Sequence, residues 1–156
     1  MSLRCPRRAG LALLLLAGAL LAACGGEGAD TGVPLVEDPW IREAPPGSRV
    51  LAGYMTLHNA GERTLVLTGA SGGDFERIEL HATQMHGDHM RMEHLHRIEL
   101  APGERTELAP GGLHLMLMGP NRTLAAGDTV DLTLDFGDDL RLPVRFEVRD
   151  TRSRAP

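Results

Sequence analysis

Apolar and polar residues alternate along most of the chain from Val33 onward, in short segments that end at Gly or Pro. Such alternation predicts β-strands with one face toward a core, and no segment shows a sustained helical period. The expected strands are Leu35–Arg42, Leu51–Asn59, Thr64–Ala70, Arg77–Thr83, His89–Leu100, Arg105–Leu108, Leu113–Met118, Thr129–Phe136 and Leu140–Val148. About nine short antiparallel strands predict an all-β fold, either a two-sheet β-sandwich or a Greek-key barrel.

The first 23 residues follow a different pattern. Arg4, Arg7 and Arg8 precede the apolar run Ala9–Ala23, which is too short for a comfortable membrane span and suits a signal peptide. The run ends in Leu21-Ala22-Ala23-Cys24, which resembles a bacterial lipobox, whose Cys is lipidated and becomes the first mature residue. The alternative is an ordinary signal peptide with an incidental Cys.

The segments together predict one folded domain behind a lipid anchor. We expect a signal peptide at residues 1–23, a Gly-rich flexible tether at 24–32, a β domain at 33–150 and a tail at 151–156. A lipid on Cys24 would hold the domain on a bacterial membrane in the periplasm. Gly25 follows that Cys, which favours the outer membrane by resemblance to sorted Gram-negative lipoproteins.

The cysteine content and the net charge limit which classes of protein this chain can belong to. Cys5 would leave with the signal and Cys24 would carry lipid, so no thiol or disulfide is expected in the mature fold. Removal of three Arg from the 16 basic residues leaves 13 against 21 acidic ones, a charge of 13 − 21 = −8 with His neutral. An acidic surface of this kind speaks against nucleic acid as a partner.

The segment Leu113–Met118 carries candidate metal ligands. Leu113, Leu115 and Leu117 would share the core face of a strand, and His114, Met116 and Met118 would share the opposite face. His114 and Met116 then lie side by side, at a spacing that suits a metal chelate, and Met118 is expected to pack. The alternative is that the methionines only cover the second face of the sheet, because Met commonly fills gaps.

A hairpin upstream is expected to bring two more candidates together. His81 faces away from the core, and the turn lies near Met85-His86-Gly87-Asp88. If residues 86 and 87 form the loop, His81 pairs directly with Met92; if residues 87 and 88 form it, the pair moves one step apart and stays within reach. Met92 shares parity with Ile98 and Leu100, which look like core. Met92 is therefore either a ligand, separated from these core residues by a bulge, or buried packing.

The four candidate ligands follow one another with ten, twenty-one and one residues between them, in the order His81, Met92, His114 and Met116. This spacing resembles that of the PCuAC-type periplasmic copper chaperones. The flanking residues are similar to that family as well, at Trp40–Arg42, Ile78–His81, Met90–Met92 and Pro110–Met118. The resemblance extends from about Val33 to Arg149.

The resemblance implies a cupredoxin-like Greek-key β-barrel that binds one Cu(I) through His81, Met92, His114 and Met116. Imidazole and thioether together suit this soft ion. It further implies delivery to respiratory cytochrome c oxidase, chiefly its dinuclear copper subunit, or to another copper chaperone. Family members often have a second Met directly after the first His, an optional position that Ala82 occupies here.

Other histidines and methionines of the hairpin leave alternatives open. His86 and His89, beside Asp88, either form a weaker second site for Cu(II) or Zn(II) or lie in a solvated polar turn. Met85 or Met90 could add a thioether to the main site. His58, His94 and His96 have no constellation of their own and are expected to be surface or structural residues.

A carrier is expected in preference to an enzyme. A blue-copper redox site needs a Cys thiolate, and zinc hydrolysis favours His or carboxylate ligands with an open position. We expect a monomeric copper chaperone. The alternative function is a general periplasmic lipoprotein that binds copper or zinc for storage or resistance.

Overall fold

The computed structural model describes residues 32–150, apart from residues 88 and 138. This part of the chain contains no helix that is long and apolar enough to cross a membrane. Its strands are β1 (Leu35–Arg42), β2 (Val50–His58), β3 (Leu65–Ser71), β4 (Phe75–His86), β5 (His89–Leu95), β6 (Ile98–Leu100), β7 (Arg105–Leu108), β8 (Leu113–Pro120), β9 (Thr129–Phe136) and β10 (Arg141–Arg149). The expected signal peptide, the lipidation site Cys24, the tether up to residue 31 and the tail lie outside the described residues.

The alternation in the sequence explains why these segments form strands with one buried face. In β9, Val130, Leu132, Leu134 and Phe136 are buried, and the residues between them are exposed or half-buried. Successive side chains of a strand point to opposite faces, so this pattern places every apolar residue of β9 against the core. The all-β prediction is confirmed.

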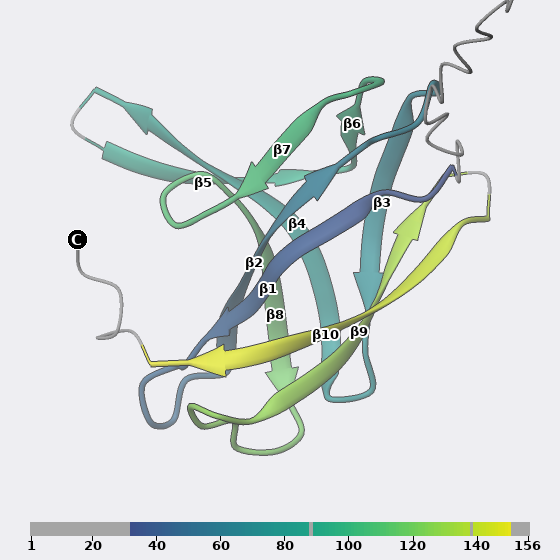
Figure 1. Ribbon diagram of the computed structural model, residues 1–156. Helices are drawn as coiled ribbons and strands as arrows, with labels where there is room; N and C mark the ends of the chain where they lie inside the picture. The colour runs from purple at the N-terminus through teal and green to yellow at the C-terminus, as the bar shows by residue number, and fades with distance from the viewer. Residues whose placement is uncertain (1–31, 88, 138, 151–156) are drawn as a thin grey trace, which may run out of the picture.

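The strands form one sheet in the order β5-β4-β8-β7-β2-β1-β10-β9-β3-β6, and β2 also pairs with β8 (Figure 1). Most neighbours are antiparallel, but β1 pairs with β10, and β7 with β8, in parallel. The expectation of a wholly antiparallel fold was wrong at these two places. β7 and β8 both run antiparallel to β2, one along each half of it, and are therefore parallel to each other.

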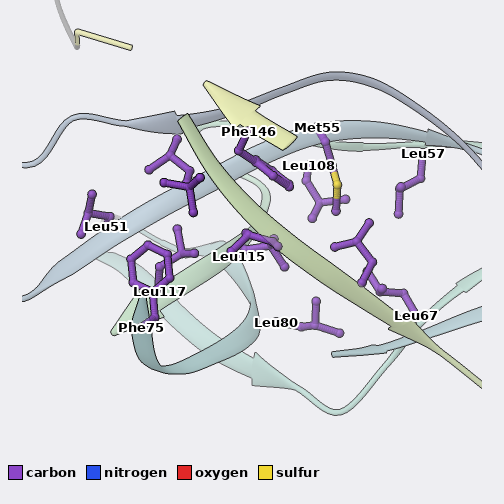
Figure 2. Close-up of a cluster of buried hydrophobic side chains, with 14 of the residues drawn as sticks. Leu51, Met55, Leu57, Leu67, Phe75, Leu80, Leu108, Leu115, Leu117 and Phe146 are labelled. Atoms are coloured by element: carbon purple, nitrogen blue, oxygen red, sulfur yellow. The ribbon is translucent and has the colours of Figure 1, made fainter. Parts of the chain in front are cut away.

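The sheet curls around a single apolar core, because β3, near one edge of the strand order, packs beside β4, near the other. Figure 2 shows side chains from many strands meeting inside this core. Phe146, Leu80, Leu115 and Leu117 are among the fully buried residues. Burial of such side chains is the main favourable term in folding, so the barrel has a core even without a disulfide.

The segment expected as one strand, His89–Leu100, is two strands. β5 ends at Leu95 and pairs only with β4, whereas β6 begins at Ile98 and pairs with β3. The chain bends between them, so no bulge is needed to separate the exposed methionines from the buried Ile98 and Leu100. The sequence alone does not reveal this break, because the alternation of positions continues in step from one strand into the next.

The β4–β5 hairpin adopts the second of the two expected registers. His86 pairs with His89, as this register requires. Gly87 has φ +61°, a conformation that Gly adopts without steric cost and that tight hairpin loops favour. His81 consequently faces His94, and Met92 faces Thr83. The hairpin extends beyond the rest of the sheet (Figure 1).

Candidate metal centre

Strand β8 separates leucines from candidate ligands as the sequence predicts. Leu115 and Leu117 are fully buried in the core, and the alternation of the strand turns His114 and Met116 to the opposite face. His114 is nevertheless only 6% exposed. Part of the cover comes from β2, where the ring of Tyr54 lies 6.5 Å from the imidazole, measured between centroids.

Strand β4 brings His81 to the same place. His81 and His114 are direct cross-strand partners, and their ring centroids lie 5.9 Å apart. Two residues further along each strand, Glu79 faces Met116. Side chains of directly opposed residues share a face and start about 5 Å apart at their Cβ atoms. Both imidazoles and the Met116 thioether therefore lie on one face of two neighbouring strands.

Hydrogen bonds fix which imidazole nitrogens are available to a ligand. His114 Nδ1 lies 3.1 Å from the carbonyl oxygen of Gly112 and donates to it, which leaves Nε2 free. His81 Nε2 lies 2.9 Å from Glu79 Oε2, and a proton on Nε2 donates to that carboxylate. His81 Nδ1 is buried and has no hydrogen-bond partner among the described residues. An imidazole that ligates a metal usually donates its other ring N–H to an acceptor of this kind, which holds the ring in position.

Met92 lies at the surface of the same face. Its side chain is 60% exposed, so it is not buried packing. Met92 faces Thr83 and is therefore diagonal to His81, a separation of roughly 7–8 Å that long side chains can bridge. A pocket of about 420 Å³ is lined by Met92, His114 and Met116 together. The structure thus brings all four predicted ligands to one face, although Met92 does not face His81 directly.

The histidine opposite His81 is His94, which was expected to be a surface or structural residue without a constellation of its own. The ring centroids of His81 and His94 lie 5.5 Å apart, and those of His94 and His96 lie 5.0 Å apart. His114, His81 and His94 therefore form a row across β8, β4 and β5. The sequence could have identified His94 through the second expected register, because a loop at residues 87 and 88 pairs residue 81 with residue 94.

The predicted weaker site lies at the tip of the hairpin. His89 is exposed and is the backbone partner of His86, whose side chain lies outside the described part of the structure. Met85 and Met90 face each other one step closer to the barrel, at 66% and 74% exposure. The site at His86 and His89 therefore stays a prediction.

The polar groups around the candidate ligands have defined charges. The hydrogen bond from His81 holds the pKa of Glu79 below its usual value, against the effect of partial burial, and Arg77 adds an ion pair at 2.8 Å. Burial raises the pKa of Tyr54, opposed by the charge of Arg42, so the phenol beside His114 stays neutral at physiological pH. Glu79 thus offers a negative charge behind His81, and the charged side chains of Arg42 and Glu43 line the pocket beside His114 and Met116.

The donors that meet on this face suit a soft metal ion. They are two imidazole nitrogens and two thioether sulfurs, a set that favours Cu(I). Among the described residues, no group of three or more His, Cys, Asp or Glu side chains is placed to hold a metal. Met118, the remaining sulfur of β8, instead accepts a hydrogen bond from Arg77 Nη2 at 3.3 Å. This partner agrees with its expected packing role.

Comparisons with known proteins place the chain in a family. The family model described as LpqE-like, a lipoprotein family, matches residues 35–148. A curated protein of Leifsonia xyli subsp. xyli, named "Putative lipoprotein Lxx21020", is 33% identical over 116 residues, which cover 74% of this chain and 69% of that protein. The match covers nearly all of the β-barrel.

Solved structures share the fold. The copper-bound PCuAC domain from PmoF2 superposes with a TM-score of 0.64 at 25% identity, covering 74% of this chain and 91% of that domain. The solution structure of CuI-DR1885 from Deinococcus radiodurans gives a TM-score of 0.63 at 30% identity, over 84% and 87% of the two chains. The cupredoxin-like fold that the sequence resemblance implied is confirmed. The chain belongs to the LpqE-like lipoprotein family, which is a family of the PCuAC type.

Proposed function

We propose that the protein is a copper chaperone that binds one Cu(I) through His81, Met92, His114 and Met116. The observation that carries this proposal is the free Nδ1 of His81, buried on the face where His114 and Met116 also lie. An unpaired buried polar atom costs free energy unless a ligand satisfies it. The copper-bound relatives with the same fold support copper as that ligand.

The donor set favours carriage over redox cycling. The sequence has no Cys after Cys24, and a blue-copper electron-transfer site needs a Cys thiolate. Thioethers bind Cu(I) without losing a proton, and only the two imidazoles must be neutral. The barrel holds His81 and His114 on strands inside the sheet, while Met92 and the pocket beside it remain open to a partner.

Transfer would proceed by ligand exchange. A donor atom of the acceptor enters beside Met92 and bonds to Cu(I) as one chaperone ligand leaves, and the ion remains Cu(I) throughout. The proposed acceptor is a copper protein such as the dinuclear copper subunit of cytochrome c oxidase, or another copper chaperone. A lipid on Cys24 would keep the domain in the periplasm near membrane-bound acceptors.

Titration of the full chain with Cu(I), under anaerobic conditions, and with Zn(II) tests the proposed site. We expect one tight Cu(I) equivalent in competition with a chromophoric Cu(I) chelator, and weaker Zn(II) binding. Met116→Leu keeps the apolar volume but removes the sulfur, and His114→Ala removes an imidazole. Each is expected to weaken that equivalent by about 100-fold or more, because loss of a ligand should cost more than loss of a group that only hydrogen-bonds a ligand, which costs about 10–100-fold.

Met118→Leu is the matched control, because it removes a neighbouring thioether of the same strand that contacts Arg77. It should leave the tight Cu(I) equivalent unchanged. Tight Zn(II) with weak Cu(I) would instead support a general zinc- or copper-binding lipoprotein. Delivery is tested separately, by mixing the Cu(I)-loaded chain with a purified apo dinuclear copper subunit and measuring the copper that each retains.

A further inference from the structure

The outer end of the β4–β5 hairpin exposes two methionines that face each other. Met85 and Met90 are direct cross-strand partners, at 66% and 74% exposure. Among the described residues only five large apolar side chains are exposed, and three of them are Met85, Met90 and Met92 of this hairpin. The core does not account for them, because the hairpin here extends beyond the barrel (Figure 1).

These methionines lie on the same face as the candidate copper site. The pairs His81 with His94, Thr83 with Met92, and Met85 with Met90 are successive same-face pairs of one register. Residues two apart on a strand are separated by about 7 Å, so each pair lies about 7 Å from the next. The Met85–Met90 pair is therefore one such step outward from Met92 and two from His81.

The chemistry of the pair suits the same cargo. Directly opposed residues have Cβ atoms about 4.5–5.5 Å apart, and Met has three rotatable bonds with which its sulfur can turn inward. Two thioethers favour Cu(I) over the harder divalent ions and need not lose a proton to bind it. Two ligands hold an ion less firmly than the four of the inner site.

We propose that Met85 and Met90 form an outer, weaker Cu(I) site, which exchanges the ion with the inner site through Met92. In each step one copper–sulfur bond forms as another breaks, and no electron or proton is transferred. This inference rests on the proposed function of the inner site. It gives the hairpin a role as the route along which Cu(I) enters and leaves.

The test is a titration of the full chain with Cu(I) alone, under anaerobic conditions. The unaltered chain should bind two equivalents, one tight and one weak, and the ε-methyl NMR signals of Met85 and Met90 should shift with the weak one. The double variant Met85→Leu/Met90→Leu keeps apolar side chains of similar size. It should lose the weak equivalent, retain the tight one, and surrender copper to a chelator more slowly.

Two variants separate this inference from the inner site. His114→Ala should lose the tight equivalent and keep the weak one, and Met118→Leu should keep both. An unaltered chain that binds only the tight equivalent, or a double variant that still binds two and releases copper at the unaltered rate, would overturn the outer site. An unaltered chain that binds only the weak equivalent would instead refute the proposed function and leave the outer site standing.

Discussion

The hairpins β4–β5 and β9–β10 alternate side chains between two faces in the same way, but they differ in what they bury. Along β9 every second residue is buried, and Phe146 and Val148 of β10 join the same core. Along β5 six of the seven residues are exposed and only Leu95 is half-buried. The β9–β10 hairpin therefore stabilises the barrel, whereas β5 contributes little to the core and carries Met92, one of the proposed ligands.

The largest expected effect comes from the buried hairpin. Phe146 is fully buried, and Phe146→Ala leaves a cavity that should lower the free energy of unfolding by about 3–5 kcal/mol. Chemical denaturation measures this loss. Any variant that remains folded should still bind Cu(I), because Phe146 lies inside the core (Figure 2) and the candidate ligands lie on the outer face.

The exposed hairpin should show the reverse behaviour. Met92→Leu keeps an apolar side chain of similar size at a position 60% exposed, so the free energy of unfolding should change by less than about 0.5 kcal/mol. Loss of the thioether should weaken Cu(I) by about 100-fold, or about 2.8 kcal/mol at 1.4 kcal/mol per tenfold. Chelator competition measures it, and unchanged affinity would remove Met92 from the site.

Glu79→Gln tests the carboxylate behind His81. The change keeps the side-chain size but removes the negative charge 2.9 Å from His81 Nε2, so the imidazole should be held less firmly in position to bind copper through Nδ1. Cu(I) affinity should fall by about tenfold, at the lower end of the effect of groups that hydrogen-bond a metal ligand. Glu99→Gln is the control, because Glu99 pairs with Arg97 at 3.0 Å on β6, away from the site.

The smallest effect is expected at an exposed pair of the buried hairpin. Hydrogen bonds from Arg145 hold the pKa of Asp131 below its usual value. A carboxyl with a lowered folded-state pKa contributes stability above its unfolded pKa, and this contribution is lost as the pH falls through the folded pKa. Asp131→Asn should therefore make stability slightly less sensitive to acid, measured by denaturation from neutral pH down to about pH 3, and leave Cu(I) binding unchanged.

Alternation in the sequence was sufficient to predict the two faces of β8, because the leucines that define the core face leave only one direction for His114 and Met116. It could not decide the register of the β4–β5 hairpin, since loops at 86–87 and 87–88 both keep His81 on the same face. The choice depends on pairing, and it decides that His94, not Met92, faces His81.

Other features depend on contacts between segments distant in the chain. The break between β5 and β6 follows from their different partners, β4 and β3, which parity within residues 89–100 does not reveal. The parallel pairing of β1 with β10 joins the two ends of the domain. Glu79 could have been noticed as a neighbour of His81 on one strand face, but its contact with Nε2 required the side-chain conformation.

Leu95 is the one residue of β5 that packs against the core, and it faces the buried Leu80. If β5 moved by two residues along β4, every side chain would keep its face, Met92 would replace His94 opposite His81, and the carboxylate of Glu93 would meet Leu80. Leu95 therefore helps to keep His94, and not Met92, directly opposite the imidazole of His81. A leucine outside the proposed donor set in this way decides from which neighbouring position the sulfur of Met92 would approach.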